Sequence, residues 1–219
     1  MYRKTVLVLT LAGVFAASAW GFEKNRARSW EFYIGPQFIG GKTLEFSGGA
    51  EADINDMASL LFGFGYNFDE HFALGATFSS TSANYKGTAV PENGGDPETF
   101  ASNMYTSSFN ITATYNFMKG PFTPYVVANV GTTYIDSGIK TGEEHEGCWW
   151  DPWWGYICAP YASTYTANKL NYGAQLGLRY DFGNSLFLKA GIGLDYVDLD
   201  THNGKDFTLY NFAVGFMFR

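Results

Sequence analysis

Hydrophobic and polar residues alternate along most of the chain after residue 30. Within Leu170–Phe182, the even-numbered positions carry Leu, Tyr, Ala or Phe, and the odd-numbered positions carry Asn, Gly, Gln, Arg or Asp. The same period of two recurs in Trp30–Phe38, Ser107–Phe117 and Leu186–Val197. A period of two is that of a β-strand whose two faces meet different environments, and it differs from helical spacing. The sequence therefore predicts an all-β fold.

Three segments, 63–78, 112–127 and 177–192, share a Tyr-(Asn/Asp)-Phe end, a short polar or Gly/Pro turn and a second alternating stretch. Each reads as a β-hairpin with a tight turn. Eight strands are predicted in all: 30–40, 57–68, 72–86, 101–117, 122–136, 168–182, 186–199 and 207–218. The remaining connections are long: 41–56, 87–100, 137–167 and 200–206. In an up-and-down meander, the tight turns then share one end and the long loops share the other.

Alternation alone leaves open a soluble barrel with an apolar interior and a membrane barrel with an apolar exterior. Aromatic residues gather where strands meet turns, as at Tyr180, Phe182 and Phe187, which is typical of a membrane-interface girdle. The polar face is rich in glycine, which suits the narrow interior of an eight-stranded barrel that side chains just fill. That face also carries charges of both signs, expected to form an ion-pair network inside: Glu31, Arg179, Asp181, Lys189 and Asp195. These features favour the membrane arrangement.

Residues 1–19 have the form of a secretory signal peptide. Arg3 and Lys4 precede an apolar run, and Ala17-Ser18-Ala19 is a cleavage site, with an alternative cleavage after residue 21. The mature chain then has twelve basic and twenty-one acidic residues, a formal charge of −9. An acidic chain is a poor partner for nucleic acid. Residues 20–29 are expected to form a short periplasmic segment before the barrel domain, 30–219.

In this arrangement the chain resembles the small bacterial outer-membrane β-barrel proteins, similar to the OmpA transmembrane domain and to OmpX. The resemblance rests on the strand pattern and on the aromatic last strand, with Tyr210, Phe212, Phe216 and Phe218. It departs from the family's usual aromatic end by one residue, Arg219. It implies an integral, monomeric protein of the outer membrane with short periplasmic turns, long extracellular loops and contacts with lipid and lipopolysaccharide.

Catalytic or metal-binding chemistry finds little support in the sequence. His71 falls in a tight turn, and His145 and His202 lie in acidic loops. No histidine stands beside a serine as in the hydrolytic barrels, and no paired Cys or His spacing marks a zinc site. We therefore expect no enzyme, cofactor or metal.

The stretch GCWWDPWWGYIC, residues 147–158, holds four tryptophans and both cysteines. Export favours a disulfide between Cys148 and Cys158. Centring a hairpin on Trp153 pairs these cysteines and places Trp150 opposite Tyr156, with a five-residue connection from Asp151 to Gly155. The candidate contact residues of this loop are Trp149, Trp150, Trp153, Trp154 and Tyr156. They are interpreted either as a contact surface for a partner or as aromatics resting on lipid headgroups.

Three functions remain open. The extracellular loops, chiefly 137–167, are predicted to mediate surface binding or adhesion to a protein, a glycan or lipopolysaccharide. The alternatives are a structural membrane component without a specific ligand, and a narrow porin-like channel or transporter for apolar molecules of the OmpW kind.

Overall fold

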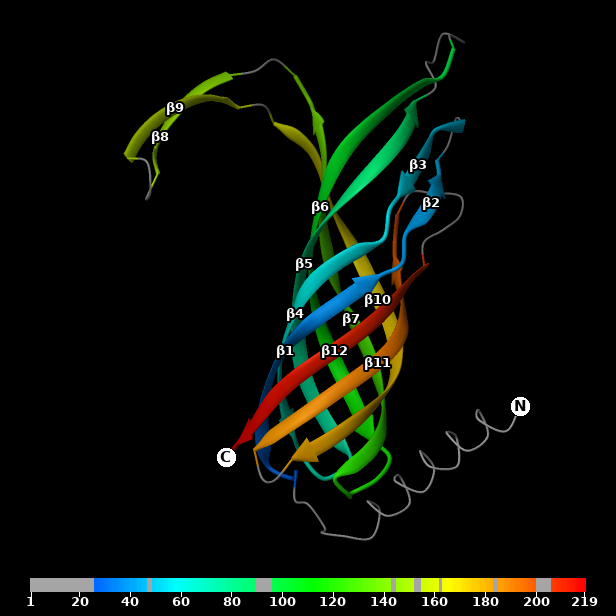
Figure 1. The fold of residues 1–219 in the computed structure, drawn as a ribbon, viewed down its shortest axis with the longest axis vertical. Coiled ribbons are helices and arrows are strands. Elements are labelled where there is room, and N and C mark those ends of the chain that lie inside the picture. Colours follow the sequence, from blue (N-terminus) through cyan, green and yellow to red (C-terminus); the bar gives the residue numbers. More distant parts are fainter. Residues whose placement is uncertain are drawn as a thin grey trace, which may run out of the picture.

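The barrel is closed by eight long antiparallel strands (Figure 1). The computed structural model describes residues 26–46, 49–89, 96–142, 145–151, 155–161, 163–182, 185–199 and 206–219. The barrel strands are β1 (Ser29–Ile39), β4 (Met57–Asn67), β5 (Phe72–Ala89), β6 (Glu98–Asn116), β7 (Phe122–Lys140), β10 (Thr164–Phe182), β11 (Leu186–Val197) and β12 (Asp206–Phe218). Each pairs with its neighbour in chain order, and β1 pairs with both β4 and β12. The predicted eight-stranded meander is confirmed.

Four shorter strands lie in segments that the sequence assigned to loops. β2 (Lys42–Glu45) and β3 (Glu51–Ile54) form a hairpin, and β3 pairs with the outer part of β5, so it extends the barrel wall. β8 (His145–Asp151) and β9 (Gly155–Tyr161) form a separate two-stranded sheet that projects from the loop end (Figure 1). A membrane needs about 9–11 residues of tilted strand. The 18 residues of β5 and the 19 of β6 therefore continue well beyond a bilayer.

The apolar face of the barrel is outside. On β10, Leu176 is 62% exposed, whereas Asn171 and Arg179 are at most 2% exposed. The same contrast holds on β1, where Trp30 and Phe32 point outward. A soluble barrel would bury these residues, so the membrane arrangement is the correct one. No helix in the described part of the chain is long and apolar enough to cross a membrane.

Aromatic rings on the exterior contact one another near the turn end of β1, β4 and β5. Trp30 stacks on Phe64 at 5.0 Å and touches Tyr66 at 4.8 Å between ring centroids. Tyr66 meets Phe68 edge-on at 5.1 Å, and Phe68 stacks on Phe72 at 5.9 Å. This continuous row fits the aromatic girdle that membrane barrels place at an interface.

The tight turn between β4 and β5 is held by Asp69. Its Oδ1 accepts hydrogen bonds from the backbone N–H of Phe72 (2.8 Å) and of His71 (2.7 Å), the Asx pattern of short turns. These two donors lower the pKa of the exposed Asp69 carboxyl. The imidazole of His71 lies on Tyr115, and its Nδ1 is 2.7 Å from the Asn116 carbonyl oxygen. The histidine thus joins this turn to β6. In the β10–β11 turn, residues 183–184 lie outside the described residues.

Candidate functional site

A cluster of buried charges fills the turn end of the lumen. Glu31 on β1 accepts hydrogen bonds from Arg179 Nη1 at 2.7 Å and from Lys189 Nζ at 2.5 Å. Arg179 Nε donates to Asp181 Oδ1 at 2.8 Å. The four side chains meet because each occupies an inward position, and Arg179 is paired directly with Lys189 across β10 and β11. Every charge in this set therefore has an opposite partner, as buried ions require.

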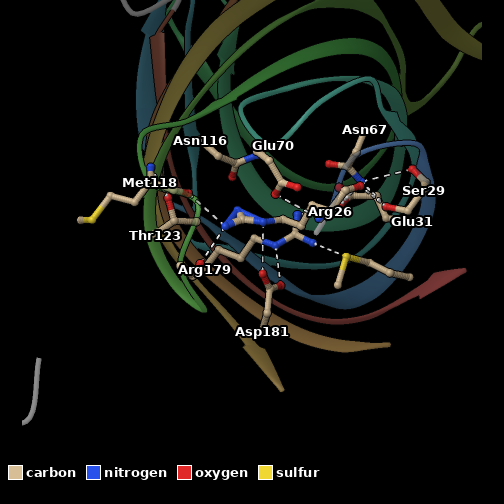
Figure 2. A network of polar contacts seen from close by, with 12 residues as sticks. Arg26, Ser29, Glu31, Asn67, Glu70, Asn116, Met118, Thr123, Arg179 and Asp181 are labelled. Carbon is tan, nitrogen blue, oxygen red and sulfur yellow. Dashed lines mark hydrogen bonds and ion pairs between the residues drawn. The ribbon is translucent and has the colours of Figure 1, made fainter. Parts of the chain in front are cut away.

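Arg26, which precedes β1, covers the lumen at its turn end. Its side chain is fully buried, and its Nη2 donates to the carbonyl oxygens of Met118 (3.0 Å) and Gly120 (2.7 Å) in the β6–β7 turn. Its Nε lies 3.2 Å from Asp181 Oδ2. Figure 2 shows the Asp181 carboxylate on one side of both arginines, where it contacts the Nε of Arg26 and that of Arg179. The sequence predicted only that residues 20–29 form a short periplasmic segment. It did not predict that Arg26 enters the lumen and binds Asp181.

Glu31, Arg179, Asp181 and Lys189 form, together with Arg26, the floor of the lumen. Aromatic rings pack against this floor. The guanidinium carbon of Arg179 lies 4.1 Å from the centre of the Phe187 ring, and Lys189 Nζ lies 4.3 Å from that of Tyr33. Phe187 is fully buried, so its assignment to the exterior girdle was wrong. The reason is register: Phe187 is two residues from the inward Lys189 and shares its face. Cation–π contacts of this kind stabilise desolvated cations.

Above this floor the lumen contains a cavity of about 360 Å³. The expectation that side chains fill the narrow interior was therefore wrong. Many of the side chains that line this cavity are short and polar, among them Thr77, Ser79, Asn110, Thr112 and Asn129, and this leaves space across the barrel.

The middle of the cavity is lined by amides and one carboxylate. Asn129 Nδ2 donates to Asp195 Oδ1 at 3.0 Å, and Asn211 Nδ2 donates to Gln175 Oε1 at 2.6 Å. Asp195 was expected to share in the ion-pair network. In the structure its carboxylate instead accepts a hydrogen bond from Asn129 in this layer. Arg179 forms its ion pairs with Glu31 and Asp181.

The loop end of the lumen is apolar, which the polar inner face of the strands did not predict. Leu44 and Ile54 come from the β2–β3 hairpin, within a segment predicted to be loop, and pack on Tyr85 and Phe207. The full buried set is Leu44, Ile54, Met57, Ala83, Tyr85, Val197 and Phe207. Most of it also lines the cavity. A strand pattern in 41–56 was the signal that could have revealed this apolar end.

The β8–β9 hairpin has the register that centring on Trp153 predicts. Cys148 pairs with Cys158, and Trp150 with Tyr156. Trp150 is 78% exposed, Tyr156 is 61% exposed, and their ring centroids are 6.0 Å apart. Trp153 and Trp154 lie outside the described residues, as does the signal peptide. The side chains of Trp149 and of both cysteines also lie outside the described part, so the disulfide stays a prediction.

Known proteins share this architecture. OprG from Pseudomonas aeruginosa superposes with a TM-score of 0.57 at 12% identity, covering 91% of this chain and 100% of that one. Ail, the attachment invasion locus protein of Yersinia pestis, solved in complex with the heparin analogue sucrose octasulfate, gives 0.50 at 9% identity, covering 88% and 99%. No curated protein matches the sequence significantly. The family described as outer membrane protein beta-barrel domain matches residues 7–219. The chain therefore belongs to this family of bacterial outer-membrane β-barrels.

Proposed function

We propose that this outer-membrane barrel binds a small, mainly apolar molecule in its lumen. The observation that carries the proposal is the cavity of about 360 Å³ between the charged floor and the apolar loop end. Small-molecule sites are concave, mostly apolar and carry a few polar groups, and they measure about 300–1,000 Å³. The lumen of this barrel meets each of these criteria.

The floor makes the lumen a blind chamber rather than an open pore. Arg26, Glu31, Arg179 and Asp181 are each at most 3% exposed, so these side chains pack closely across the turn end. Moving any one of them would separate charges that are paired in a medium of low dielectric constant, which is costly. We therefore propose that a ligand enters from the loop end and is held there.

Binding in the lumen is tested with 2-phenylethanol as the probe and methyl NMR of the micelle-embedded protein as the readout. We expect the probe to shift the inward methyl groups of Val127 and Leu209, which line the cavity. The outward methyl groups of Leu176 and Leu188 should not shift, because they face detergent. Equal shifts on both faces would mean partition into the micelle and would contradict the proposal.

A matched pair of variants on β7 supports this test. Val127→Trp places a large ring in the cavity and should abolish the inward shifts. Val130→Trp adds the same ring three residues away on the exterior, where Val130 is 51% exposed, and should leave them intact. Heat-dependent mobility on SDS gels verifies that both variants fold as barrels.

The β8–β9 hairpin supports a second function, surface binding of an extracellular protein or glycan. Two exposed rings on a paired hairpin lose little entropy on contact, and Trp and Tyr are enriched at binding hot spots. The co-crystallised heparin analogue belongs to Ail. A net charge of −7 disfavours such a polyanion as the partner of this chain.

For this second function, we expect the double variant Trp150→Ala/Tyr156→Ala to lower adhesion of protein-bearing cells to immobilised matrix protein or neutral glycan. The loss should be about tenfold or more, since a hot-spot ring contributes 2 kcal/mol or more. Tyr165→Ala is the control, because Tyr165 is also an exposed ring at the loop end. Unchanged adhesion in the double variant would instead favour rings that rest on lipid headgroups.

A further inference from the structure

The middle of the lumen holds amide oxygens that have no hydrogen-bond donor. Four asparagines around the cavity have a buried Oδ1 without a hydrogen-bond partner, and each of these residues is at most 7% exposed. They come from four different strands, β6, β7, β10 and β12. The four are Asn110, Asn129, Asn171 and Asn211. Buried polar atoms are nearly always satisfied, so each of these oxygens is an acceptor that lacks a donor.

The orientation of one amide follows from chemistry. Asp195 Oδ1 can only accept when the carboxyl is ionised, so the Asn129 atom 3.0 Å away must be the donor Nδ2. The remaining atom of that amide is therefore the acceptor Oδ1, which is buried and has no hydrogen-bond partner. The Nδ2 of Asn171 is engaged by Thr133 Oγ1 at 3.0 Å, and that of Asn211 by Gln175.

Asp195 adds a negative charge to this layer. Its side chain lies over Gly173, where a Cβ would come within 1.9 Å of Asp195 Oδ1, so the glycine is what admits the carboxylate. Two cations also line the cavity, Lys189 and Lys169. Lys189 is bound by Glu31 in the floor, and Lys169 follows Asn168 toward the loop end of β10, away from the Asp195–Gly173 pair.

We propose that Asp195 and the surrounding amide oxygens bind the ammonium group of a small amine whose apolar part occupies the apolar end of the lumen. An ammonium group offers three donors and no acceptor, which complements a carboxylate and amide oxygens that lack donors. Its positive charge also offsets that of the half-buried Asp195 carboxylate, and charge-assisted hydrogen bonds are the stronger kind. This inference rests on the proposed lumen site and specifies the chemistry of its ligand.

The test compares 2-phenylethylamine with 2-phenylethanol, two probes of one shape that differ in the head group, by the same methyl shifts. We expect the amine to bind about tenfold or more tightly, because a hydrogen bond to a charged group contributes about 1.5–3 kcal/mol. Asp195→Asn should remove this preference and change the affinity for the alcohol less than about twofold. Asp198→Asn, at an exposed carboxylate beyond the end of β11, should leave the preference intact.

The outcomes separate this inference from the proposed function. If the alcohol binds in the lumen and the amine binds no better, the proposed ammonium site is contradicted, and the proposed binding of an apolar molecule in the lumen is retained. If neither probe shifts the inward methyl groups, the chamber itself is wrong. The comparison of the two probes on the unaltered protein needs no variant, so a folding defect in Asp195→Asn would not prevent a decision.

Discussion

Replacing Glu31 with glutamine is expected to destabilise the barrel by about 3–5 kcal/mol. Glu31 is the shared acceptor for Arg179 and Lys189, and all three are at most 9% exposed. Removing its charge leaves two cations in the lumen with too few partners, and removing one member of a buried ion pair carries this cost. Urea-induced unfolding of the protein in phospholipid bilayers, followed by heat-dependent mobility on SDS gels, measures the change in the free energy of unfolding.

The matched control is Glu98→Gln. Glu98 is an exposed carboxylate near the start of β6, beyond the membrane, where loss of one charge should change stability by about 0.5 kcal/mol or less. If both variants unfold at the same urea concentration, the buried cluster does not stabilise the barrel.

Placing an arginine at Leu176 is expected to cost about 2–4 kcal/mol. Leu176 points to lipid from the middle of β10, where it is 62% exposed and pairs with Val126 and Ile192. A guanidinium at that depth must be desolvated or must distort the bilayer. The same unfolding measurement in bilayers reports the cost.

Tyr165→Arg provides the comparison on the same strand. Tyr165 is as exposed as Leu176 but lies eleven residues nearer the loop end, where an arginine meets water or headgroups and costs about 0–1 kcal/mol. A large difference between the two positions reports membrane depth. Equal effects would contradict the transmembrane position of the central part of β10.

The alternating sequence predicted the strands and the side each residue faces, because the period of two is set locally by the pleat. Arg179 and Leu176 were placed inside and outside on this ground, and their exposure agrees. The empty space above the floor could not be predicted in the same way. Whether a lumen is filled depends on how glycines and side chains from all eight strands meet, which alternation along one strand does not report.

Two residues of the floor show the same limit. Phe187 lies beside a tight turn, where an aromatic residue suits the girdle. Only its spacing of two residues from Lys189, which puts both on one face of the strand, shows that it points inward. Arg26 precedes the first strand and follows no pattern at all. Its place depends on carbonyl groups of the β6–β7 turn, more than ninety residues away.

The position of Arg26 has a consequence for assembly. The floor draws on the segment before β1, on β1 itself, on the β6–β7 turn and on β10 and β11. A sheet that has not yet joined β1 to β12 cannot bring Glu31 to Arg179 and Lys189, or Arg26 to Asp181, although the Arg179–Asp181 pair within β10 needs no closure. The ion pairs of Glu31 and Arg26 therefore stabilise only the closed barrel and make closure cooperative. The segment ahead of the first strand therefore stabilises the barrel only after β12 has paired with β1.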